Sequence, residues 1–274
     1  MSTEQEFLSQ TAKNKYNTPA LEKGLDIIEA LSESDAGFTL NQLAKHLNKN
    51  VSQIFRMVVT LAERGYIQCD DNDRYTLTLK LFELANKQPP LKRLIQKALP
   101  FMKELADTAR QSSHLTVYQN GRVIVIAQIE NPERWSFGVK VGAVIGLTDT
   151  SSGHVLMAFH DESKQQQMLE MHSTVHGEPE VTFDKLKEKL QEVKKLGFSR
   201  MPSKQVQGII NIAFPIYSEQ NKVIAAINVP FLPRIDNAPG PDVEMVTRIE
   251  AAIGERLSRE LGYRGDYLFV TEAH

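Results

Sequence analysis

The sequence predicts an α+β protein of two domains, and three observations lead to this prediction. A run of short amphipathic helices ends in a hairpin within the first part of the chain. A longer helix and a clear hairpin open a second part, which closes with two apolar strands and a final helix. The 274 residues, 41% hydrophobic and 24% charged, have the length and composition of two ordinary globular domains.

The first domain, expected over residues 17–78, begins with three helices. Thr18 caps the first helix before Pro19, and a polar break at Asn48 to Asn50 separates the other two. The apolar positions at helical spacing are Leu21, Leu25, Ile28 and Leu31, then Leu40, Leu43, Ala44 and Leu47, then Ile54, Val58, Leu61 and Ala62. The segments YIQCD and DRYTL predict a hairpin, so the pattern is that of a winged helix-turn-helix.

The polar face of the third helix carries side chains suited to DNA. Gln can pair with adenine and Arg with guanine, each through two hydrogen bonds, while the lysines suit phosphates. The candidate DNA-binding residues are Lys45, Lys49, Ser52, Gln53, Phe55, Arg56, Arg64 and, near the wing tip, Arg74. The alternative for this stretch alone is a plain helical hairpin with a solvated basic face.

Charge, cysteine content and hydropathy exclude several classes of protein. The formal net charge of −2 means that DNA contact must come from a local basic patch. Cys69 is the single cysteine, so neither an internal disulfide nor a zinc site of several thiolates can form. The sequence has no run of 18 apolar residues and its first residues have no apolar signal core, so we expect a cytoplasmic protein without membrane partners, with a flexible tail over residues 1–16.

A linker helix is expected over residues 79–90, within a helical stretch from Leu77 to Lys87 that prolines 89 and 90 stop. A long helix follows from Leu91 to Gln111, and Pro100 predicts either a kink or two abutting helices. Asn120 and Gly121 form the two-residue turn of a hairpin, and a third strand is expected within Trp135 to Val141.

The rest of the second domain, expected over residues 91–265, mixes helices with strands. Thr150, Ser151 and Ser152 precede a short apolar helix and can cap it, and such a helix start presents free N–H groups to an anion. Helices are expected over 162–172, 183–196 and 242–261, with two strands in IINIAFPIYS and VIAAINVPF and a tail over 266–274. These elements predict helices packed on an antiparallel sheet.

Together, ALEKGLDIIEAL, FRMVVTLAERGYI, DRYTLTLKLFELA, TDTSSGHVLMAF and GIINIAFPIYSEQNKVIAAINV resemble the IclR family of bacterial transcription regulators, from about Thr18 to Gly262. The resemblance implies a winged helix-turn-helix, a linker helix and a GAF-like effector-binding domain. It also implies a homodimer or dimer of dimers on double-stranded operator DNA, acting mostly as a repressor. Leu21 to Leu31 and Leu77 to Ala85 are the candidate intersubunit surfaces.

The family's effector pocket carries over only in part. The implied effector-binding residues are Thr150, Ser151, Ser152, Gly153, Met201, Ile209, Asn211 and Asn228. Met201 stands where relatives often have an acidic residue, and Asn211 stands where a cysteine is common. Neutral hydrogen-bonding groups at a helix start suit a carboxylate or a sugar acid better than an aromatic hydrocarbon, although both asparagines can also serve as ordinary strand or turn residues.

Other chemistry finds little support in the residues. His172 and His176 have the spacing of metal ligands, but Ser173, Thr174 and Gly177 indicate a loop, so no metal or other cofactor is expected. The sequence has no nucleophile elbow, phosphate loop or dinucleotide fingerprint, so we expect no catalysis. The sequence therefore predicts a DNA-binding regulator controlled by a metabolite; the alternatives are a small-molecule enzyme or an adaptor whose winged helix binds protein.

Overall fold

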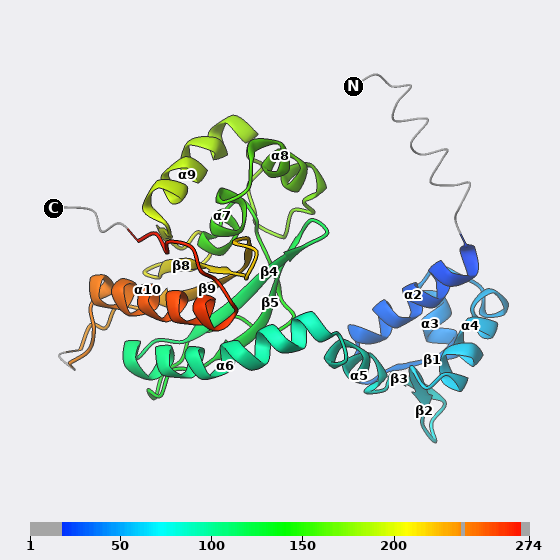
Figure 1. Ribbon diagram of the computed structural model, residues 1–274. Coiled ribbons are helices and arrows are strands. Elements are labelled where there is room, and N and C mark those ends of the chain that lie inside the picture. The colour runs from blue at the N-terminus through cyan, green and yellow to red at the C-terminus, as the bar shows by residue number, and fades with distance from the viewer. Residues whose placement is uncertain (1–17, 237–238, 270–274) are drawn as a thin grey trace. The chain divides into compact units, whose positions relative to one another are not determined.

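A computed structural model describes residues 18–236 and 239–269 and divides the chain into two compact units, Met1–Pro89 and Pro90–His274 (Figure 1). The tail expected over residues 1–16 lies outside the described residues, as do residues 270–274 of the other expected tail.

Unit 1 is a small helical bundle with a three-stranded sheet of order β1-β3-β2, antiparallel throughout. Its elements are α2 (Pro19–Ser32), β1 (Phe38–Thr39), α3 (Leu40–His46), α4 (Val51–Glu63), β2 (Ile67–Cys69), β3 (Arg74–Leu77) and α5 (Lys80–Asn86). Ile27, Leu43, Ile54 and Ile67 bring α2, α3, α4 and β2 into one buried cluster. The predicted helix-turn-helix and hairpin are confirmed.

The turn between α3 and α4 follows from its residues. Asn48 adopts a left-handed conformation at φ 52°, which asparagine tolerates better than most residues. Thr39 begins α3 by accepting a hydrogen bond from the Gln42 N–H on its side-chain oxygen, and Gln42 Oε1 accepts one from the Thr39 N–H at 2.9 Å. These caps satisfy N–H groups that a helix start would otherwise leave open.

The helix expected from Leu77 begins three residues later, at Lys80. Leu77 still pairs with Ile67 in the hairpin, and the Thr78 N–H donates to the Tyr66 carbonyl at 3.0 Å. Sheet pairing therefore holds these two residues extended, although their apolar spacing also fits a helix.

Unit 2 contains one six-stranded antiparallel sheet of order β6-β5-β4-β9-β8-β7. Its strands are β4 (Ser113–Gln119), β5 (Arg122–Ile129), β6 (Val144–Ile145), β7 (Ser199–Pro202), β8 (Ile210–Tyr217) and β9 (Val223–Phe231). Its helices are α6 (Pro89–Ala109), α7 (Ser151–Ala158), α8 (Glu162–Met171), α9 (Phe183–Leu196) and α10 (Val243–Glu260). Asn120 and Gly121, at φ 48° and 79°, form the predicted hairpin turn.

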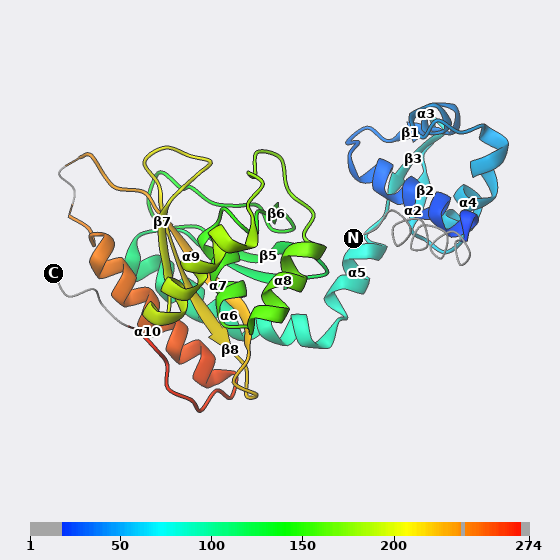
Figure 2. The same ribbon diagram turned by 90° about the horizontal axis from the view of Figure 1, so that it is seen from above.

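Helices cover both faces of this sheet (Figures 1 and 2). Helices α6 and α10 pack on one face, and α7 lies on the other with α8 and α9 beside it. The alternation of β8 explains the layers, because Ile212 and Phe214 point toward α6 and α10 while Ala213 points toward α7. Small side chains on the α7 face let this short helix approach the sheet closely.

Two details of unit 2 differ from the sequence prediction. No strand forms within Trp135 to Val141; the sheet instead gains the short edge strand β6, in which Ile145 pairs with Val123. The sequence analysis also missed β7, a four-residue edge strand too short for an alternating pattern to be recognised. Helix α6 runs through Pro100 as one element, so the two-helix alternative is wrong.

Described residues of the expected carboxyl-terminal tail pack on the sheet domain. The Tyr267 hydroxyl donates to the Pro215 carbonyl at 2.8 Å. Phe269 meets the rings of Phe198 and Phe214 edge to face, at centroid distances of 5.6 and 5.5 Å. The aromatic rings thereby extend the core beyond α10.

Candidate nucleic-acid interface and ligand cavity

Helix α4 presents a polar, cationic face. Ser52, Gln53, Phe55 and Arg56 are exposed, and Phe55 keeps 49% of its surface accessible. Lys45, Lys49 and Arg64 are also exposed. Among the described residues, none of the cations at 45, 49, 56 and 64 forms an ion pair or a side-chain hydrogen bond. These side chains are therefore available to an anionic partner.

Gln53 caps its own helix, a role that was not predicted from the sequence. Its Oε1 accepts a hydrogen bond from the Asn50 N–H at 2.9 Å and so caps α4. A bidentate contact to adenine needs that same oxygen as an acceptor. Base reading by Gln53 would therefore require the cap to break, which leaves Arg56 as the side chain best prepared for a base.

Arg74 also differs from its expected place at the wing tip. Its Nη1 donates to the carbonyls of Ala36 at 3.3 Å and Gly37 at 2.9 Å, and the residue is half-buried. The tip itself is organised by Asp70, whose Oδ1 accepts from the N–H groups of Asn72 and Arg74 at 2.9 Å each. Arg74 ties the hairpin to the segment before β1 and has only its remaining N–H groups for phosphate.

Unit 2 contains a cavity of about 370 Å³ between the sheet and the start of α7. Four connecting segments, the strands β4, β6, β8 and β9 and the first residues of α7 line it. Its lining residues are His114, Phe137, Val139, Val144, Ile145, Gly146, Thr150, Ser151, Ser152, Val175, His176, Ser203, Gln205, Val206, Asn211, Asn228 and Pro230. The volume suits a small metabolite.

Several polar atoms of the cavity are buried without partners among the described residues. Asn228 Nδ2 donates to Ser151 Oγ at 2.8 Å, but Asn228 Oδ1, Ser152 Oγ and His114 Nδ1 make no hydrogen bond. Burial lowers the pKa of His114 to about 4, so its ring is neutral at pH 7. Buried polar groups in this condition favour a ligand or water that satisfies them.

The start of α7 faces this cavity. Thr150 Oγ1 accepts from the Gly153 N–H at 3.0 Å and donates to the Gly146 carbonyl at 2.6 Å. This cap leaves the N–H groups of Ser151 and Ser152 without an acceptor inside the helix. The lining includes no lysine or arginine, so dipoles and neutral donors provide what attraction the cavity has for an anion.

The effector-site residues inferred from sequence divide into two sets. Thr150, Ser151, Ser152, Asn211 and Asn228 line the cavity. Gly153, Met201 and Ile209 are buried beside it instead. A Cβ on Gly153 would stand 2.1 Å from the Leu147 carbonyl oxygen, so this glycine permits close packing rather than ligand contact.

His114 and Phe137 are cavity residues that the sequence analysis missed. Strand parity offered a signal for His114, because Leu115 points into the α6 and α10 core and its neighbour must face α7. His114 also stands opposite Asn228 in the β4–β9 register. Phe137 gave no such signal, since its segment was expected to be a strand.

Two further classes of site are absent from the described ranges. No group of three or more histidine, cysteine, aspartate or glutamate side chains there could hold a metal ion. Within residues 18–236 and 239–269, no helix has both the length and the apolar character needed to cross a bilayer.

Two family profiles match the chain. The IclR helix-turn-helix domain matches residues 20–71, and the bacterial transcriptional regulator IclR C-terminal domain matches residues 91–238. The HTH-type transcriptional regulator KdgR of Escherichia coli (strain K12) is 28% identical over 251 residues, which cover 90% of this chain and 94% of KdgR.

Solved structures share this fold. An IclR transcriptional regulator from Alicyclobacillus acidocaldarius superimposes with a TM-score of 0.69 at 23% identity, covering 89% of this chain and 99% of the other. An IclR homologue from Microbacterium hydrocarbonoxydans, complexed with 4-hydroxybenzoate, gives a TM-score of 0.73 at 22% identity, covering 88% and 98%. The winged helix-turn-helix and the sheet domain are therefore the two domains of this fold.

Proposed function

This chain belongs to the IclR family of bacterial transcriptional regulators, and from that premise we propose that it is a repressor whose operator affinity is controlled by a small hydroxylated carboxylate. Members of the family bind DNA through the helix-turn-helix and are not enzymes. The proposal rests on one combined observation. Unit 1 has exposed cations along α4 without ion-pair partners among the described residues, and unit 2 has a cavity with buried polar atoms that make no hydrogen bond. A bacterial regulator that binds operator DNA acts in the cytoplasm, so we propose this location for the protein.

For DNA, α4 is the reading helix. Arg56 contacts a base edge, and Lys45, Lys49 and Arg64 hold phosphates. Ser52 and Phe55 add contacts from the same face. A gel shift with the DNA flanking the protein's own gene tests this assignment: the fragment should bind more tightly than random duplex at moderate ionic strength. Equal binding to both would contradict it.

For the effector, the polar atoms of the cavity define the chemistry. The free N–H groups at the start of α7 favour a carboxylate. Asn228 Oδ1 is a hydrogen-bond acceptor, so it needs a donor on the ligand, such as a hydroxyl group. A sugar acid provides both groups, and its hydroxyls can also reach Ser152 and His114.

Calorimetric titration of the full-length protein tests this class of ligand. Sodium gluconate should bind, whereas sodium hexanoate, which has the carboxylate but no hydroxyl, should bind at least about tenfold more weakly because buried polar atoms stay unsatisfied. The 4-hydroxybenzoate that the Microbacterium homologue binds carries both groups on an aromatic ring and tests the shape of the cavity. Binding of toluene alone would contradict the proposal.

The operator-bound form is a homodimer or a dimer of dimers. One recognition helix covers only a few base pairs, so two half-sites are needed for specificity. Leu21, Leu25 and Leu79 leave 62%, 49% and 80% of their surfaces exposed in unit 1, within the two segments inferred as intersubunit surfaces. Leu25→Asp should lower the dimer fraction in sedimentation velocity runs, while Leu232→Asp, at an exposed leucine of unit 2, serves as the control.

A further inference from the structure

The segment from His172 to Glu178 leaves the end of α8 and forms one wall of the cavity. Val175 and His176 line the cavity from this segment. The Glu178 N–H donates to the Val175 carbonyl at 3.0 Å, which closes the segment into a turn. The position of these two lining residues therefore depends on what holds this turn.

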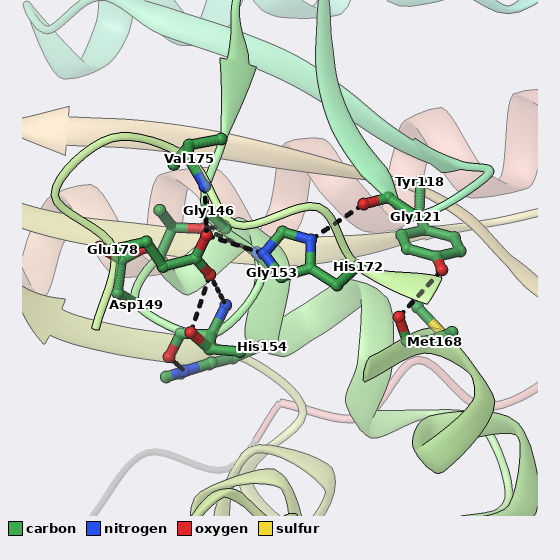
Figure 3. A network of polar contacts seen from close by, with 12 residues as sticks. Tyr118, Gly121, Gly146, Asp149, Gly153, His154, Met168, His172, Val175 and Glu178 are labelled. Carbon is green, nitrogen blue, oxygen red and sulfur yellow. Dashed lines mark hydrogen bonds and ion pairs between the residues drawn. The ribbon is translucent and has the colours of Figure 1, made fainter. Parts of the chain in front are cut away.

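The Glu178 carboxylate holds it through four donors (Figure 3). Its Oε1 accepts from the Thr148 N–H and the Thr148 hydroxyl, both at 2.8 Å. Its Oε2 accepts from the Val175 N–H at 3.1 Å and faces His172 Nε2 at 2.7 Å. The side chain has no exposed surface. Burial works to raise the pKa of Glu178, but the bonds from Thr148, His172 and Val175 outweigh it and keep the pKa below its usual value, so the group is ionised.

His172 is held from both sides of its ring. Nδ1 lies 2.9 Å from the Gly121 carbonyl oxygen, which can only accept a hydrogen bond, so this nitrogen carries a proton. Nε2 lies 2.7 Å from Glu178 Oε2. The ring therefore links the β4–β5 turn to Glu178 and ties a third element into the wall.

Gly146, two positions before Thr148, must be small for Glu178 to bind there. A Cβ on Gly146 would stand 1.9 Å from Asp149 Oδ1 and 2.9 Å from the Glu178 carboxyl carbon. Gly146 thus lets the carboxyl groups of Asp149 and Glu178 approach the same turn. Burial, followed by the charge of Glu178, raises the pKa of Asp149.

The opposite wall, Ser203 to Val206, is attached far more weakly. Gln205 Nε2 donates to Asp149 Oδ2 at 2.6 Å, and Asp149 Oδ1 stays without a partner among the described residues. Residues 204–208 are all exposed. The two walls are therefore attached at adjacent residues, Thr148 and Asp149, but the Glu178 carboxylate has four donors and the Gln205 side chain makes a single hydrogen bond to Asp149.

We propose that Glu178 is a positioning residue of the cavity: it fixes Val175 and His176 against the turn that leads into α7, so the cavity opens to ligand at Ser203 to Val206. This inference depends on the proposed function in one respect: it assumes that the cavity is the effector site. A ligand seated on the start of α7 then meets one wall that is already in place and one that closes over it.

Hydrogen exchange of the full-length protein without ligand, followed by mass spectrometry, tests this assignment. In the natural protein the N–H groups of Val175 and Glu178 should exchange at least about tenfold more slowly than those of residues 204–208. The Val175 N–H donates to the Glu178 carboxylate and the Glu178 N–H closes the same turn, so the turn must open first, whereas the N–H groups of Gln205 and Val206 donate to the neutral Ser203 hydroxyl. Glu178→Gln should accelerate exchange at 175 and 178 about tenfold or more. Exchange at 204–208 should stay unchanged.

Matched variants separate positioning from general loss of structure. Thr148→Val removes one donor with little change of shape and should accelerate exchange at Val175 in the same way, whereas Thr148→Ser keeps the hydroxyl and should behave as the natural protein. Glu250→Gln alters another fully buried glutamate, on α10, and should leave Val175 unchanged.

Unchanged exchange at Val175 in Thr148→Val, or in a Glu178→Gln protein that unfolds at its normal temperature, would overturn the proposal. So would a natural protein in which residues 204–208 exchange more slowly than 175 and 178. Because no DNA or effector is present, these outcomes are independent of whether the proposed repressor function holds.

Discussion

At the scale of single residues, the hydrogen bonds that a side chain already makes decide whether it is available to a partner. Gln53 and Arg56 stand three positions apart on α4, and both suit base recognition by residue type. The Gln53 oxygen already caps its helix, while Arg56 has no partner among the described residues. We therefore expect the proposed base reading to depend on Arg56 and not on Gln53.

Arg56→Ala should therefore weaken specific operator binding by about 1 to 3 kcal/mol and relax sequence choice. Lys49→Ala should lower affinity evenly across sequences and reduce the slope of affinity against salt by about one. Fluorescence anisotropy with operator and scrambled duplexes at several salt concentrations measures both effects. If both variants bind as the natural protein does, α4 is not the reading helix.

Glu178 and Glu250, two glutamates with fully buried side chains, illustrate how surroundings set charge. Burial raises the pKa of Glu250 well above the usual 4.5, and the nearby Val229 backbone opposes this shift only weakly. The folded protein thus holds this proton more tightly than the unfolded chain. Stability contributed at this site falls as pH rises above about 4.5 toward the folded-state pKa.

Glu250→Gln removes that dependence because an amide cannot ionise. The stability of the variant relative to the natural protein should increase between pH 5 and pH 8, by at most about 1.4 kcal/mol per pH unit. Urea unfolding at pH 5, 6.5 and 8 measures it. A relative stability that stays constant over this range would show that Glu250 is ionised in the folded protein.

At the scale of elements, backbone conformation at a few turns determines where helices end. Gly197 ends α9 at φ 89°, and its position brings the Leu268 carbonyl close: an added Cβ would lie 2.1 Å from that oxygen. One glycine therefore both terminates a helix and admits the segment after α10. Gly142 also has a positive φ, of 87°, but open space around it.

Gly197→Ala and Gly142→Ala separate these two contributions. The Gly142 variant should lose about 1 to 2 kcal/mol from the left-handed backbone alone. The Gly197 variant should lose at least about 1 kcal/mol more, because the Leu268 backbone must move as well. Thermal unfolding of both proteins measures the difference, and equal losses would mean that the 268 segment moves aside without cost.

At the scale of the whole molecule, the proposed function assigns DNA to unit 1 and the effector to unit 2, so regulation would be a coupling free energy between two sites. Linkage requires the effect to be reciprocal. If a ligand of the cavity lowers operator affinity by some factor, operator DNA must lower the affinity for that ligand by the same factor. A ligand with equal affinity for both states of the protein would regulate nothing.

With gluconate as ligand, we expect a factor of about 5 to 150 in each direction. Operator titrations with and without gluconate, and gluconate titrations with and without operator, give the two factors independently. Gluconate that binds without changing operator affinity would contradict control through this cavity and leave the DNA-binding assignment in place.

Short-range features of this protein were predictable from its sequence. The caps at Thr150 and Gly197, the Asn120–Gly121 turn and the alternation within β8 depend on residues a few positions apart, so local sequence was enough to locate most helices and strands and the start of α7. Asn228 was inferred as a pocket residue from the family resemblance, and it does line the cavity. The family resemblance was recognised from several motifs of this kind, which occur in the family's order along the chain.

Contacts between distant segments were decided by the tertiary structure alone. Glu178 meets Thr148 across 30 positions and His172 meets Gly121 across 51, and no pattern along the chain encodes either contact. Arg74 is tied to Gly37, and the segment around Phe137 lines a cavity instead of pairing as a strand, for the same reason. Sequence periodicity reports which face of an element is buried, but only packing in three dimensions determines which polar groups meet there.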